Sequence, residues 1–214
     1  MNVSLDDREA ELKKRLSIPY KWGQRQNDDW DRRTNFVYHI YSFDAFQIEL
    51  SARFGKDSFK DTLIDYALNR WFNFWSAKAV EESFCAHPLV HVARNQQDRQ
   101  VDFSIRDIPF DHKTSIFPKG FKRSLEYAQQ HREELVQWFY ESQSQEQRKH
   151  LKNRIFIVLH DVSGEHWKLK AEVVWLGSLI RSYLDGFDKS KLSRHQFNNT
   201  TETLADVIWA VRSR

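Results

Sequence analysis

The sequence predicts a globular protein of mixed α/β (α+β) class, in which helices flank a central mixed sheet. Three observations lead to this prediction. The 214 residues are 40% hydrophobic and 29% charged, a composition typical of folded domains. Six glycines and four prolines are too few for an all-β protein with many tight turns. The spacing of apolar residues also changes along the chain, from three or four residues to the alternation of short strands.

Composition also limits the environment and the partners. No apolar run approaches the ~18 to 20 residues that span a bilayer, and the first residues contain no apolar signal core, so we expect no membrane partner. The single cysteine, Cys85, cannot form an internal disulfide, which favours a cytoplasmic location. The net charge of +3 and the isoelectric point of 8.9 permit a nucleic-acid partner without requiring one.

The chain is expected to form a single domain, in which residues 1–57 are an N-terminal helical extension that packs on a core formed by residues 58–214. Ser4 can cap the first helix, and the polar segment after it has the composition of a loop. Trp22 and Trp30 in that segment are expected to pack on the core rather than to stack on bases. The predicted elements are a helix over 5–16, a loop over 21–33 and a helix over 34–54.

The core begins with a stronger helix signal. Ser58 and Asp61 form a start resembling a capping box, and the helical spacing then continues to about Phe84, before Pro88. Three short segments rich in β-branched and aromatic residues follow, and they predict three antiparallel strands. The predicted strands are LVHVAR, QVDFSI and IPFDHKTSIF.

Helical spacing returns after these strands. RIFIVLH is a compact apolar run, typical of a strand buried on both faces. The remaining predicted elements are a helix from Lys122 to about His150, the buried strand over 154–160, a helix over Glu165–Leu184, a polar, irregular tail over 185–203 and a last strand, ADVIWAV.

The second and third strands place charged residues together. A hairpin turn at Arg106–Asp107 sets Asp102 opposite Asp111, about 4.5–5.5 Å apart between Cβ atoms. Lys113 shares the face of Asp111, because side chains alternate along a strand. The opposite face is apolar and is expected to face the core. It consists of Val101, Phe103, Ile105, Ile108 and Phe110.

Two neighbouring carboxylates repel each other, and a divalent cation relieves the repulsion. Mg²⁺ prefers such hard oxygen ligands, completed by water and by substrate phosphate. A lysine beside the ion can orient a metal-bound water. The alternative is a solvated polar face with an ordinary cross-strand ion pair.

The order of these elements resembles the PD-(D/E)XK nuclease superfamily, the restriction-endonuclease-like fold. The resemblance is an αβββαβ order over roughly residues 58–160, with a glutamate on the first helix, Asp102 on the second strand and Asp111-His112-Lys113 on the third. Val101 stands where the family name has proline, a position at which the superfamily varies.

The resemblance implies Mg²⁺-dependent hydrolysis of phosphodiesters, with Mn²⁺ as a substitute, by a DNA endonuclease of the restriction, repair or defence type. Asp102 and Asp111 would bind the metal together with the backbone carbonyl of His112, and Lys113 would position the attacking water. Glu81 fits the family's spacing of a further carboxylate better than Glu82 does, and both remain candidates.

Basic residues follow the third strand and are expected to contact the nucleic-acid backbone. The candidates are Ser115, Lys119, Lys122 and Arg123. Many nucleases of this kind are homodimers that cut both strands. The second hypothesis is a catalytically inactive subunit of the same fold, which binds nucleic acid or another protein.

Overall fold

A computed structural model describes residues 3–22, 26–93, 101–142, 152–197 and 202–213. The chain divides into two compact units, and the division falls within helix α4 (Lys60–Cys85). The first unit consists of Met1–Val80 with Lys170–Val174, and the second of Glu81–Leu169 with Trp175–Arg214. From the sequence we placed the boundary of the N-terminal extension at residue 57; the first unit continues to Val80.

The first unit is built of helices, as predicted. Its first helix begins where Ser4 accepts a hydrogen bond from the backbone N–H of Asp7, which satisfies a donor of the first turn. Its elements are α1 (Leu5–Lys14), η1 (Arg15–Ser17), α2 (Asp28–Arg33), η2 (Asn35–Tyr38), α3 (Phe43–Phe54) and the larger part of α4.

The loop predicted over residues 21–33 is wrong for its second half, which forms α2. Asn27 caps this short helix by accepting the backbone N–H of Trp30. Trp30 is buried and packs edge-on against Tyr66, with 5.4 Å between ring centroids. The expectation that Trp30 packs on the core is thus confirmed. The burial of one aromatic ring stabilises a helix whose other residues are all charged.

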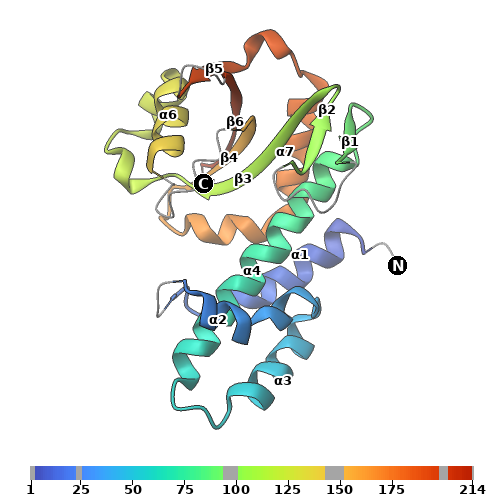
Figure 1. Ribbon diagram of the computed structural model, residues 1–214, viewed down its shortest axis with the longest axis vertical. Helices are drawn as coiled ribbons and strands as arrows, with labels where there is room; N and C mark the ends of the chain where they lie inside the picture. The colour runs from blue at the N-terminus through green and yellow to red at the C-terminus, as the bar shows by residue number, and fades with distance from the viewer. Residues whose placement is uncertain (1–2, 23–25, 94–100, 143–151, 198–201, 214) are drawn as a thin grey trace. The chain divides into compact units, whose positions relative to one another are not determined.

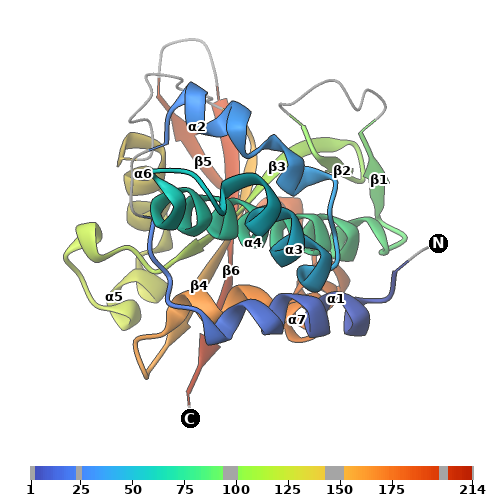
Figure 2. The same ribbon diagram turned by 90° about the horizontal axis from the view of Figure 1, so that it is seen from below.

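The single helix predicted over residues 34–54 is also wrong, because the chain breaks between η2 and α3. The indole N–H of Trp71 donates to the carbonyl of Ile40 at 2.7 Å, so this carbonyl is bonded outside a helix. Ser42 then caps α3. The rings of Phe43 and Phe46 pack on Trp71 at 5.1 and 5.5 Å, which holds α3 beside α4 (Figure 1, Figure 2).

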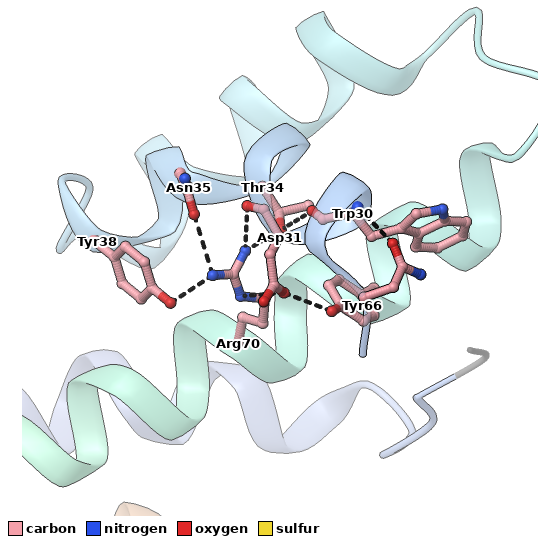
Figure 3. A network of polar contacts seen from close by, with 8 residues as sticks. Trp30, Asp31, Thr34, Asn35, Tyr38, Tyr66 and Arg70 are labelled. Atoms are coloured by element: carbon pink, nitrogen blue, oxygen red, sulfur yellow. Dashed lines mark hydrogen bonds and ion pairs between the residues drawn. The ribbon is translucent and has the colours of Figure 1, made fainter. Parts of the chain in front are cut away.

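Arg70 joins α4 to the segment that contains α2 and η2 (Figure 3). Its guanidinium is almost completely buried, and oxygen atoms of that segment surround it. A buried charge is tolerated only where its donors are satisfied, so this network fixes the position of α2 and η2 on α4. The acceptors are the carbonyl of Asp31 and the side chains of Thr34, Asn35 and Tyr38.

The second unit contains a six-stranded mixed sheet, which confirms the predicted sheet type. Its strand order is β1-β2-β3-β4-β6-β5. The first three strands are antiparallel, β3, β4 and β6 are parallel, and β5 is antiparallel to β6. The strands are β1 (Val90–Val92), β2 (Phe103–Ile105), β3 (Ile108–Ile116), β4 (Arg154–Asp161), β5 (Ser193–Gln196) and β6 (Glu202–Arg212).

All five predicted strands are present, and β5 is an addition within the tail that we expected to be irregular. The remaining helices are η3 (Lys119–Phe121), α5 (Leu125–Gln130), α6 (Arg132–Ser142), η4 (His166–Ala171), α7 (Val173–Asp185) and η5 (Lys189–Lys191). The helix predicted over 122–150 is divided at His131, whose φ of −123° and ψ of 51° leave the helical region. The last part of that prediction, residues 143–150, lies outside the described residues.

Helices cover both faces of the central strands (Figure 1). On one face, Phe139 of α6 stacks on Phe156 of β4, with 4.8 Å between centroids. On the other face, the Tyr183 hydroxyl of α7 donates to Asp206 of β6. Strand β4 is therefore buried on both faces, as its apolar run predicts, and Ile155–Leu159 are completely buried.

We predict that Phe156→Ala lowers the free energy of unfolding by about 3–5 kcal/mol, because it leaves a cavity beneath α6. Val162→Ala provides the control, since Val162 is 57% exposed, and it should change stability by less than ~0.5 kcal/mol. Urea unfolding followed by circular dichroism measures both. Equal effects of the two substitutions would contradict the described core.

Candidate active site

The hairpin of β2 and β3 has the register that the sequence predicts. Phe103 pairs with Phe110 and Ile105 with Ile108, on either side of a turn that begins at Arg106. Arg106 has a φ of 54°, in the left-handed region, where a non-glycine residue is uncommon. The predicted apolar face is confirmed for Phe103, Ile105 and Phe110, which are all buried.

Asp102 lies just before β2 and forms three polar contacts with β3. Its backbone N–H donates to the carbonyl of Phe110 at 3.0 Å. Its Oδ2 accepts the backbone N–H of His112 at 2.9 Å and lies 2.6 Å from Nδ1 of the same residue. The Asp102 carboxylate thus accepts a backbone hydrogen bond that a carbonyl of the neighbouring strand accepts in a regular sheet. The His112 ring is oriented by this contact and stacks on Phe103.

Asp111 is paired with Arg154, the first residue of β4. The parallel register sets the two residues side by side. The Arg154 Nε donates to Oδ2 of Asp111 at 2.7 Å, and Nη2 of the same guanidinium donates to the same oxygen. The guanidinium also lies over the rings of Tyr140 and Phe156, 5.8 Å from each centroid. The amino-acid sequence does not predict this pair, because the register between β3 and β4 cannot be read from it.

The two carboxyl groups lie close enough to influence each other, and their pKa values move in opposite directions. Burial would raise the pKa of Asp102, but the hydrogen bonds and charge of His112 outweigh it and lower the pKa to about 2. Burial raises the pKa of Asp111, and the charge of Asp102 adds to this, against the opposing charge of Arg154.

Lys113 lies on the same face of β3 as Asp111 and pairs with Phe156 of β4. Burial lowers its pKa to about 8, and the charge of Arg154 lowers it further, against the attraction of Asp111. The side chain is therefore closer to neutrality at physiological pH than an exposed lysine. An ammonium group in this environment can orient a water molecule and exchange a proton with it.

The donor types of this cluster fit a hard divalent cation. Two neighbouring carboxylates repel each other, and an ion such as Mg²⁺ could relieve the repulsion, with water and phosphate oxygens completing its shell. Among the described residues, no group of three or more histidine, cysteine, aspartate or glutamate side chains is placed to hold a metal ion. A third carboxylate in the site stays a prediction, as does the role of the His112 carbonyl.

Glu81 and Glu82 lie near the end of α4, and both are partly buried. Phe84, three residues after Glu81, packs on Phe103 and His112 at 4.5 and 6.1 Å between ring centroids. Residues three apart share one side of a helix, so Glu81 lies on the side of α4 that faces this hairpin. Whether Glu81 or Glu82 serves the site stays a prediction.

The residues predicted to bind nucleic acid lie along and beyond β3. Ser115 shares the strand with Asp111, and Lys119, Lys122 and Arg123 follow its carboxyl end, in η3 and the turn after it. Asp111 lies beside the first residue of β4, at the opposite end of the parallel strands. From Asp111 to the end of β3 the strand rises by about 17 Å. A ligand that contacts both groups must therefore extend along β3.

Comparisons with protein-family models, with curated proteins and with solved structures find no match for this chain. In the part of the chain that the structure describes, no helix has the length and apolar character needed to cross a membrane.

The Asp102–His112 contact predicts an acid-dependent stability. The pKa of Asp102 is about 2 in the folded chain and about 3.9 in an unfolded one, so the folded state binds fewer protons between these values. The contribution is present above about pH 4 and is lost as the pH falls towards 2. Asp102→Asn should lower the free energy of unfolding by about 1–2 kcal/mol at pH 7, and the difference from wild type should shrink below pH 4.

Denaturant titrations from pH 7 to pH 2 measure this difference. The exposed Asp29→Asn substitution is the control and should change stability by less than ~0.5 kcal/mol at pH 7. A difference between Asp102→Asn and wild type that stays constant from pH 5 to pH 2 would show that the carboxylate of Asp102 is not stabilised by His112.

Proposed function

We propose that this protein is a Mg²⁺-dependent DNA endonuclease, which hydrolyses phosphodiester bonds of nucleic acid. The observation that supports the proposal most strongly is the position of Asp102 opposite Asp111 on the hairpin, with Lys113 on the same strand face as Asp111. The elements follow one another in the order α4, β1, β2, β3, helices and β4. This is the αβββαβ order on which the resemblance to the PD-(D/E)XK nucleases rests.

In the proposed site, the divalent metal would activate a water and neutralise charge on the phosphate. Asp102 and Asp111 would hold it, together with the His112 carbonyl and, as the further carboxylate, Glu81. His112 orients Asp102 through its backbone N–H and its ring. Lys113 would donate a hydrogen bond to the attacking water and hold it in line with the phosphorus. Its reduced pKa would let it take part in moving the proton of that water.

Substrate binding would use the backbone phosphates. Ser115 lies two residues beyond Lys113 on the same strand, and Lys119, Lys122 and Arg123 continue the polar and basic line past the end of β3. A nucleic-acid strand running along β3 would contact them in succession. Cleavage of both strands of a duplex would then require a homodimer, and we place the enzyme in the cytoplasm.

The alternative is an inactive subunit of the same fold that binds nucleic acid or a protein. One observation favours it: Asp102 and Asp111 already bond to His112 and Arg154 of the chain itself. Such a module would bind DNA in a salt-dependent manner that chelators do not change. Metal-dependent strand cleavage would exclude it.

We predict that Lys113→Ala lowers the rate of metal-dependent cleavage by about 100- to 1,000-fold, because the water loses its positioning group. Lys168→Ala is the matched control, since Lys168 bonds only to Glu165 among the ion pairs of the described residues and should leave the rate unchanged. Cleavage is measured on single-stranded, duplex, branched and methylated DNA and on RNA, with Mg²⁺ or Mn²⁺. The proposal fails if wild type and Lys113→Ala are equally inactive on the whole panel.

A further inference from the structure

Arg154 pairs directly with Asp111, one of the two proposed metal ligands. The strand register brings its backbone next to Asp111, and two guanidinium nitrogens donate to Oδ2 of that carboxylate. The side chains are only 15% and 26% exposed. Charged hydrogen bonds with this little access to water are strong, because solvent screens them weakly.

The surroundings of Arg154 hold its guanidinium in this position. It lies over the rings of Tyr140 and Phe156. The Tyr140 hydroxyl donates to the carbonyl of Lys152 at 2.6 Å, and Phe156 is stacked on Phe139. Both rings are therefore fixed by contacts of their own. The pairing with Asp111 costs little further conformational entropy, unlike that of a freely rotating surface arginine.

We propose that Arg154 is a built-in counter-cation of Asp111, which a divalent metal must displace before it binds, so that Arg154 sets the metal affinity of the site. The inference rests on the proposed function, which assigns Asp111 as a metal ligand. Its physical basis is competition. The Arg154 guanidinium and the metal ion would both bind the Asp111 carboxylate, and two positive charges this close together repel each other. Removal of the competitor must then strengthen metal binding by the free energy of displacement.

The second unit offers a matched comparison in Arg132 and Asp206. Arg132 donates to Asp206 at 2.8 Å, and the Asp206 side chain is 9% exposed. Asp206 also accepts the backbone N–H of Val207 and the hydroxyl of Tyr183. This carboxylate is thus engaged by structural donors. Loss of Arg132 removes an arginine–aspartate pair without freeing a proposed metal ligand.

The test is calorimetric titration of Mn²⁺ into wild type, Arg154→Gln, Arg154→Lys and Arg132→Gln. Arg154→Gln is expected to bind Mn²⁺ about 5- to 50-fold more tightly than wild type. Arg154→Lys keeps the charge and loses the fork of donors, so its gain should be smaller. Arg132→Gln should bind as wild type does. The gain in Mn²⁺ affinity should disappear in the double variant Arg154→Gln/Asp111→Asn. That loss would show that the gain arises at Asp111.

Affinity that is unchanged or weaker in Arg154→Gln overturns the inference, as does an absence of Mn²⁺ binding in every variant. Circular dichroism confirms folding, and if Arg154→Gln does not fold, the affinity of Arg154→Lys decides in the same way. The substrate panel separates the two proposals. Cleavage by wild type without a gain in affinity in Arg154→Gln overturns only the inference. A gain in affinity that depends on Asp111, with no cleavage by any variant, supports the inference and overturns the proposed nuclease activity.

Discussion

The complete burial of strand β4 is the constraint on which the second unit depends. Ile155–Leu159 expose no surface, so helices must cover both faces of the strand and hydrogen-bonded strands must flank both edges. The parallel ladders to β3 and β6 satisfy the backbone of this segment. They also fix which residues are neighbours: Arg154 lies beside Asp111 because the apolar run after it can occupy only one register in the core.

This burial also explains the electrostatics at the edge of the core. Asp102 and Asp111 lie where water reaches them only in part, and each charge needs a partner there. His112 supplies one for Asp102, and Arg154 supplies one for Asp111. The arrangement leaves two acidic groups beside each other.

The Arg70 network of the first unit solves a similar problem differently. Every acceptor of its guanidinium is a neutral oxygen, from a carbonyl, a hydroxyl or an amide, apart from a longer contact with the Asp31 carboxylate at 3.5 Å. No pair of like charges is brought together there (Figure 3). Arg70 therefore fastens α2 and η2 to α4, whereas the cluster on β3 retains charge repulsion that a cation could relieve. The Arg70 network therefore contributes to stability, whereas the cluster of Asp102 and Asp111 is the candidate for catalysis.

The sequence by itself determined the elements with strong local signals: the long helix α4, the register of the β2–β3 hairpin and the buried strand β4. Spacing of apolar residues, caps and alternation act over a few residues, and they placed Asp102, Asp111 and Lys113 correctly on the hairpin. Only the tertiary structure decided the rest. Helix α2 depends on the burial of Trp30, the break before α3 depends on Trp71, and the partner of Asp111 depends on the pairing of β3 with β4. These contacts join residues distant in the chain, so no local pattern encodes them.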